Sequence, residues 1–100
     1  MFLDNSDMPD ASASTLRIRL DRHIGLRIRS ARENAGMSQA ALGQAVEVSF
    51  QQIQKYETAV NSISASMLIQ IATALKVDLP YFLAEFRSDA VENETQVGRC

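Results

Sequence analysis

Residues 38–57 read SQAALGQAVEVSFQQIQKYE, and this stretch decides the fold. Ser38 and Ser49 each precede a short segment with apolar residues at helical spacing, and serine is a preferred N-cap residue. The S-x-x-Q pattern from Ser49 to Gln52 is typical of a capping box. The stretch therefore predicts two short helices, about 38–46 and about 49–58, joined by a turn of about three residues.

The apolar residues of this stretch favour a steep crossing of the two helices. The residues expected to hold them together are Leu42, Val46, Val48 and Ile53, with Ala45 and Tyr56 also on the inner faces. Gly43 would let the two segments approach closely, since glycine has no side chain. This spacing fits a helix-turn-helix.

Three more helices are predicted on either side. The first begins at Asp21 and stops at Gly36, a fourth follows Ser64, and a fifth follows Asp78, with Pro80 in its first turn. Their expected inner residues are Ile24, Ile28, Ala31 and Ala35; Leu68, Ile71, Ala72 and Leu75; and Leu79, Phe82, Leu83 and Phe86. The expected fold is all-α: one compact five-helix domain over residues 21–86.

The two ends of the chain differ from this body. Residues 1–14 are polar and aperiodic, which predicts a disordered tail, and residues 87–100 form an acidic C-terminal tail. Leu16–Leu20 alternates apolar and basic residues, so this short arm is a strand, a helix or a DNA-binding arm. The net charge is −2. Residues 17–84, however, carry eight Lys or Arg against five Asp or Glu.

The composition also excludes several classes of protein. No apolar run is long enough to cross a membrane, and the N-terminus lacks the features of a secretory signal. One cysteine, Cys100, and one histidine, His23, rule out a disulfide framework and predict no metal site and no cofactor. No catalytic group can be assembled from these residues, so an enzyme is not expected. A small-molecule effector domain is not expected, and the expected compartment is the cytoplasm, associated with the nucleoid.

The sequence resembles the phage-repressor/Cro-type helix-turn-helix family, also called the xenobiotic-response-element (XRE) type. The resemblance rests on segments in the family's order and spacing over about two thirds of the chain. These are IGLRIR at 24–29, GMSQ at 36–39, Leu42-Gly43, VSFQQIQKYE at 48–57, IAxALxV at 71–77 and Tyr81-Phe82. It implies a lambda-repressor-like fold whose third helix is the DNA recognition helix of a bacterial transcriptional regulator.

The resemblance also implies roles for individual residues. Gln39 matches a position that bonds a DNA phosphate, and Arg32 with Glu57 matches a partly buried ion pair. The positions that face the major groove are matched by Ser49, Phe50, Gln51 and Lys55. From the helical wheel alone, Gln51, Lys55 and Thr58 point away from Ile53, with Gln54 on the flank. Asn61, in the turn that follows, completes the set of expected DNA-binding residues.

Each of these interpretations has an alternative. An exposed helix face rich in glutamine is often only solvated, and Phe50 belongs either to the core of the capping turn or to the DNA contact. Two positions depart from the family. Glu47 stands where glycine is usual, and a positive φ there would cost roughly 1–2 kcal/mol. Residues 58–62 lack the basic residues that hold the DNA backbone.

The sequence thus predicts sequence-specific binding of double-stranded DNA, with transcription regulated, in the manner of a repressor, by occupation of an operator. A chain this small would read paired half-sites as a homodimer. The expected dimer surface is the fifth helix, through Phe82, Leu83 and Phe86, with Leu16–Leu20 as a second candidate. The alternative function is a protein-interaction module, such as an antitoxin or adaptor, with weak DNA affinity.

Overall fold

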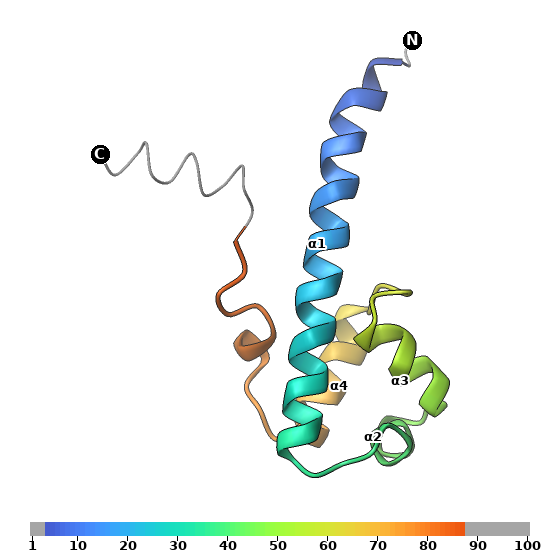
Figure 1. The fold of residues 1–100 in the computed structure, drawn as a ribbon, viewed down its shortest axis with the longest axis vertical. Helices are drawn as coiled ribbons and strands as arrows, with labels where there is room; N and C mark the ends of the chain where they lie inside the picture. The colour runs from blue at the N-terminus through green and yellow to red at the C-terminus, as the bar shows by residue number, and fades with distance from the viewer. Residues whose placement is uncertain (1–3, 88–100) are drawn as a thin grey trace, which may run out of the picture.

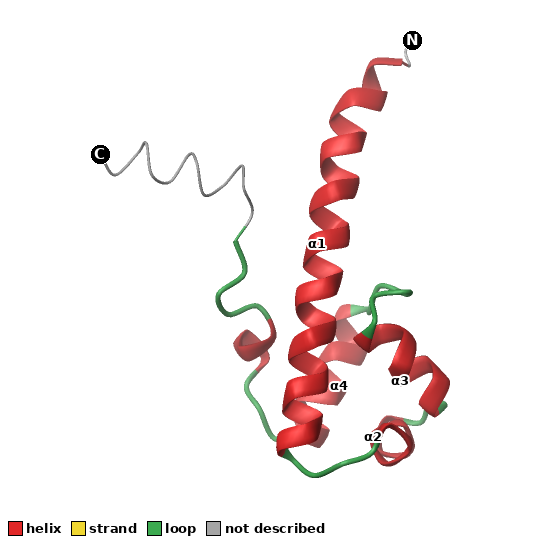
Figure 2. Cartoon of the chain, viewed as in Figure 1, coloured by secondary structure: helices red, strands yellow, loops and turns green. Residues whose placement is uncertain are grey.

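A computed structural model describes residues 4–87 of the chain, and every regular element in this range is helical (Figures 1 and 2). The elements are α1 (Asp4–Asn34), α2 (Gln39–Val46), α3 (Phe50–Glu57), α4 (Ala65–Leu75) and a 3₁₀ helix, η1 (Leu79–Phe82). The all-α prediction is confirmed for these residues. The acidic tail expected after Arg87 lies outside them.

One hydrophobic core joins all five elements. Its largest fully buried side chains are Ile28 of α1, Leu42 of α2, Ile53 of α3, Ile71 of α4 and Phe82 of η1. Each element thus contributes one side chain that is removed from water. This burial, more than helix propensity, holds such short helices in place.

The first helix begins far earlier than predicted. α1 runs without interruption from Asp4 to Asn34, so the expected disorder of residues 4–14 is wrong and the boundary expected at residue 20 falls inside a helix. Leu16–Leu20 is helical as well, which rules out the strand among the alternatives left open above. The end of α1 agrees with prediction: Gly36 follows with φ 71°, a conformation that glycine adopts without strain.

The predicted faces of the helices are mostly confirmed. Ile24, Ile28 and Ala31 are buried on α1, and all four predicted residues of α4 are buried. Two alanines are exceptions: Ala35 lies beyond the end of α1 and Ala45 points out of α2, and both are exposed. The three serine caps form as expected, with the side chains of Ser38, Ser49 and Ser64 accepting hydrogen bonds from backbone N–H groups.

The prediction of a fifth α-helix after Asp78 is wrong. Residues 79–82 form a single 3₁₀ turn after Asp78, whose side chain makes no capping hydrogen bond. Of its expected apolar stripe only Phe82 is buried, whereas Leu79 and Leu83 are 40% and 48% exposed. A helix of one or two turns is not stable without an apolar face to bury. The chain therefore has four α-helices in residues 4–87.

Candidate nucleic-acid interface

The turn between α2 and α3 is closed by backbone hydrogen bonds around a left-handed residue. Glu47 has φ 64° and ψ 42°, the conformation that the sequence suggested glycine would suit better. The N–H of Val48 donates to the carbonyl of Gly43 at 2.9 Å, which ends α2. The hydroxyl of the next residue, Ser49, accepts from the N–H of Gln52 at 3.1 Å and starts α3. The direction of α3 is therefore fixed locally at its beginning.

Gly43 is required because the turn packs directly on it. A Cβ atom at this position would lie 2.5 Å from the carbonyl oxygen of Val48, closer than real side chains come. The predicted close approach is thus present, and the backbone of the turn is what approaches. Any larger residue would push α3 away from α2.

A second glycine sets the distance between α1 and α3. A Cβ atom on Gly25 would lie 2.5 Å from the carbonyl oxygen of Tyr56 and 2.6 Å from that of Glu57. The sequence interpretation assigned no such role to Gly25. A signal was available, because a glycine inside a helical pattern costs about 1 kcal/mol and usually has a packing reason.

A buried ion pair fixes the end of α3 to α1. The Nε of Arg32 donates to Oε2 of Glu57 at 2.6 Å, and Nη2 donates to Oε1 at 3.1 Å. Both residues are buried, and Nη1 of Arg32 also donates to the carbonyl of Met37 at 2.8 Å. The hydrogen bond that Arg32 donates to Glu57 raises the pKa of Arg32 above its ordinary value, against the opposing effect of burial. The Arg32–Glu57 pair expected from the sequence is therefore present.

Gln39 joins the same network. Its Nε2 donates to Oε1 of Glu57 at 3.0 Å, so one carboxylate oxygen accepts from both Gln39 and Arg32. Gln39 is the first residue of α2, directly after the cap Ser38, and it is half-buried. This contact, across 18 residues of sequence, was not predicted. It holds the side chain that opens α2 against the last residue of α3.

The outer face of α3 is exposed and free of side-chain ion pairs in the described part of the chain. Ile53 is fully buried, whereas Gln51, Gln54 and Lys55 are exposed on the other side of the helix. Phe50 is 48% exposed and is not packed against the core, which argues against its alternative role in the capping turn. Tyr56 does pack against the core, as expected.

The loop that follows α3 carries the last expected residue, Asn61, which is exposed. Its course is set by Ala59, which has φ 64°, and by hydrogen bonds from the N–H groups of Val60 and Asn61 to the carbonyl of Lys55. The loop offers amides and hydroxyls and no cation, because residues 58–63 contain neither Lys nor Arg.

Within residues 4–87 no cluster of His, Cys, Asp and Glu could hold a metal ion. In the same range no helix combines the length and the apolar character that a membrane span requires. The arrangement of α2 and α3 instead offers an exposed polar helix on a rigid frame.

Comparison with known proteins gives consistent matches. A family model described as Helix-turn-helix matches residues 28–82. Over 66 residues the chain is 52% identical to the uncharacterized HTH-type transcriptional regulator y4wC of Sinorhizobium fredii, covering 66% of this chain and 46% of that protein. Over 78 residues it is 44% identical to an uncharacterized transcriptional regulator in the ATPase CF(0) region of Rhodospirillum rubrum, covering 78% and 71% of the two chains. The chain spans about half the length of several curated relatives that it matches.

Solved structures with the same fold include two regulators. The P22 c2 repressor, in complex with a synthetic operator, superposes with a TM-score of 0.58 and 32% identity, covering 63% of this chain and 96% of the repressor. The clp gene regulator ClgR of Corynebacterium glutamicum gives a TM-score of 0.62 and 25% identity, covering 64% and 83% of the two chains.

Proposed function

The chain belongs to the helix-turn-helix family of transcriptional regulators, of the repressor-like XRE type, and on this premise we propose that it binds a specific double-stranded DNA site through α3 in the bacterial cytoplasm. The observation that carries the proposal is the exposed face of α3, with Gln51, Gln54 and Lys55 outward and Ile53 fully buried behind them. Gly43, Gly25 and the Arg32–Glu57 pair fix the position of this helix. A base-reading helix needs that rigidity, because its side chains must meet base edges at hydrogen-bonding distance.

The exposed side chains suit the major groove. The amide of Gln51 can pair with adenine through a donor and an acceptor, and Lys55 can donate to guanine. Phe50, half exposed at the start of α3, can contact a thymine methyl group. Ser49, Gln54 and Asn61 lie beside this row and offer further polar contacts to bases or backbone.

Gln39 has a different task in this proposal. It opens α2, where free backbone N–H groups and the positive end of the helix favour a phosphate. Its Nε2 has two hydrogens, and one of them is directed at Glu57. The second remains for a phosphate oxygen, so Glu57 orients the amide before DNA arrives. A phosphate contact positions the protein and carries no base identity.

We further propose that the protein occupies an operator as a dimer on paired half-sites. One earlier expectation about the dimer surface is wrong: Phe82 is fully buried and cannot contact a partner. Leu83, Leu16 and Ile18 are 48%, 39% and 45% exposed and remain accessible, and Phe86 is half-buried.

The test of base reading is a comparison of Gln51→Ala with Gln39→Ala. A site selected from random DNA, and every single-base-pair variant of it, would be titrated with both proteins at one salt concentration. We expect Gln51→Ala to flatten the preference at one or two positions, each worth about 1–3 kcal/mol. Gln39→Ala should weaken binding to all variants by the same factor. An unchanged base preference in Gln51→Ala would contradict the assignment of α3.

One observation favours a second candidate, the protein-interaction module. The loop after α3 has no cation between residues 58 and 63, so the DNA backbone is held by few charges. If the protein is such an interaction module, selection from random DNA would enrich no motif. The wild-type protein would then bind all sequences weakly and with strong salt dependence.

A further inference from the structure

The C-terminal end of α3 lacks a cation in the loop that follows it. A recognition helix meets base edges mainly with its N-terminal residues, so its C-terminal end lies toward the DNA backbone. A helix C-terminus carries a partial negative charge, which repels phosphate. The last turn of α3 holds one cation, Lys55, which the proposed function assigns to a base, and residues 58–63 contain neither Lys nor Arg. A cation that holds the backbone there has to come from another element.

The first helix, α1, is fixed beside this end of α3 at two points. At the first, an added Cβ atom on Gly25 would lie 2.5 and 2.6 Å from the carbonyl oxygens of Tyr56 and Glu57, so the two backbones are in direct contact. At the second, four residues earlier on α1, the carboxylate of Asp21 accepts a hydrogen bond from the hydroxyl of Ser62. The end of α3 and the loop after it are thus both held along about one turn of α1.

Arg22 is an exposed cation beside both points. It follows Asp21 directly in the chain and precedes Gly25 by three residues, about 4.5 Å along the helix axis. Residues three apart on a helix are neighbours on its surface. In the part of the chain that the structure describes, Arg22 makes no hydrogen bond and no ion pair. Arg29, one turn beyond Gly25, is instead paired with Glu33 at 3.1 Å.

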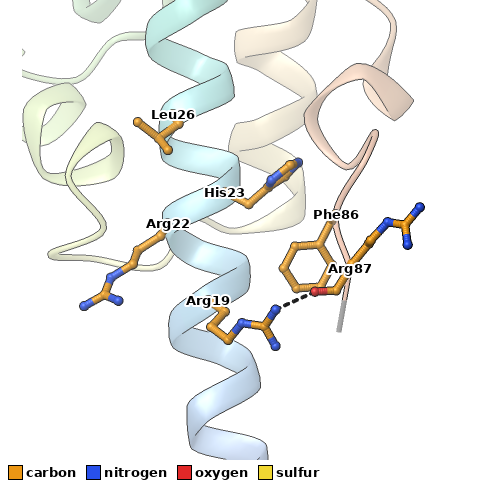
Figure 3. A pocket seen from close by; sticks show the side chains of 6 residues that line it. All are labelled: Arg19, Arg22, His23, Leu26, Phe86 and Arg87. Carbon is orange, nitrogen blue, oxygen red and sulfur yellow. Dashed lines mark hydrogen bonds between the residues drawn. The ribbon is translucent and has the colours of Figure 1, made fainter. Parts of the chain in front are cut away.

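The direction of the Arg22 side chain fits this position. In Figure 1, α3 and the C-terminal segment after η1, residues 83–87, lie on opposite sides of α1. Between α1 and the C-terminal segment is a hollow of about 320 Å³, where Arg19 donates to the carbonyl of Arg87 at 2.6 Å. Arg22 stands at the edge of this hollow, and Figure 3 shows its guanidinium directed away from Phe86 and Arg87. Arg19 is therefore directed at the C-terminal segment, and Arg22 is directed to the α3 side.

We propose that Arg22 binds a phosphate of the DNA backbone beside the C-terminal end of α3, and so supplies from α1 the cation that residues 58–63 lack. A guanidinium suits this task because it can donate two parallel hydrogen bonds to phosphate oxygens. Arg22 lies outside residues 28–82, which the helix-turn-helix family model matches. The contact is thus an addition made by the extended first helix. It rests on the proposed function, since it requires α3 to face DNA.

The test measures how DNA binding depends on salt. Wild type, Arg22→Gln and Arg22→Lys would be titrated with a site selected from random DNA and with an unselected duplex of the same length, over a series of NaCl concentrations. We expect Arg22→Gln to reduce the slope of log affinity against log salt by about 0.9 per bound protomer, and the affinity roughly tenfold at about 0.1 M salt. Arg22→Lys should retain most of the slope, because lysine also binds phosphate.

Arg19→Gln provides the matched control. It removes the same charge three residues away on α1, from a side chain that is directed at the C-terminal segment. We expect its salt slope to equal that of wild type. Circular dichroism of each variant would establish that the helices are intact. The base preference of Arg22→Gln at the selected site should also equal that of wild type, because phosphates carry no base identity.

The outcomes separate this contact from the proposed function. An unchanged slope in Arg22→Gln, an equal loss in Arg19→Gln or a changed base preference in Arg22→Gln would each overturn the phosphate contact, while an enriched motif would keep the proposed function. If no motif is enriched and Arg22→Gln still reduces the slope on the unselected duplex, the contact stands and sequence-specific binding fails. A wild type that binds no duplex at low salt would overturn both.

Discussion

The two sides of α1 are built in opposite ways. Toward α3, the contact is backbone against backbone at Gly25 and includes a buried ion pair with two hydrogen bonds. Toward the C-terminal segment, long side chains reach exposed carbonyl oxygens: Arg27 donates to the carbonyl of Ala84 at 2.9 Å and pairs with Glu85, whose side chain is 86% exposed. The first kind of contact fixes a helix in one position, whereas the second is exposed to water and should hold its segment less firmly.

The largest expected difference is between the two arginines. Arg32→Ala should lower the free energy of unfolding by about 3–5 kcal/mol, because it leaves the Glu57 carboxylate buried without its partner. Arg27→Ala should lower it by less, because its partner Glu85 is 86% exposed and such an ion pair contributes only about 0–1 kcal/mol. Urea denaturation of both variants at one protein concentration measures the difference. Equal midpoints would show that the two sides contribute alike.

Gly25 gives a second, smaller contrast. Gly25→Ala should lower the free energy of unfolding by about 1–3 kcal/mol, because the added methyl group forces α1 away from the carbonyls of Tyr56 and Glu57. Ser30→Ala, on the exposed side of the same helix, should change stability by less than about 0.5 kcal/mol. A displaced α3 should also weaken DNA binding, so titration of the folded Gly25→Ala protein adds a second measurement. Stability equal to wild type would mean that the close contact relaxes freely.

Much of the α3 side could be predicted from the sequence because its determinants are local. Ser38, Ser49 and Ser64 are N-caps that act within three residues, and the outward direction of Gln51 follows from the buried position of Ile53. The Gln39–Glu57 hydrogen bond could not be predicted, because it depends on how α2 and α3 meet in space. The ion pair was expected only through the family resemblance.

The other side was predicted poorly because its pattern misleads. Leu79, Phe82, Leu83 and Phe86 have the spacing of an amphipathic helix, yet the core has room for Phe82 alone. The start of α1 was missed because its polar residues lack the spacing of an apolar stripe. Periodicity detects only those helices whose apolar residues recur at helical spacing.

The smallest expected effect concerns two glutamates that share one backbone conformation. Glu47, between α2 and α3, has φ 64°, and Glu85, in the C-terminal segment, has φ 65°. Glycine adopts this conformation without the clash of a Cβ atom, so replacing either residue removes strain of roughly 1–2 kcal/mol, partly offset by the greater freedom of the unfolded chain.

The two sides should respond differently to that change. Glu47→Gly should raise the free energy of unfolding by about 1 kcal/mol, because the turn unfolds together with the core that Leu42 and Ile53 form. Glu85→Gly should leave it nearly unchanged, since the ion pair with Arg27 is lost and a chain segment held by exposed contacts opens before the core does. Urea midpoints measure both, and hydrogen exchange of the amides around residue 85 would show the early opening. An equal gain in the two variants would mean that the C-terminal segment is as firmly ordered as the turn, and the contrast between the two sides of α1 would then lie in their exposure alone.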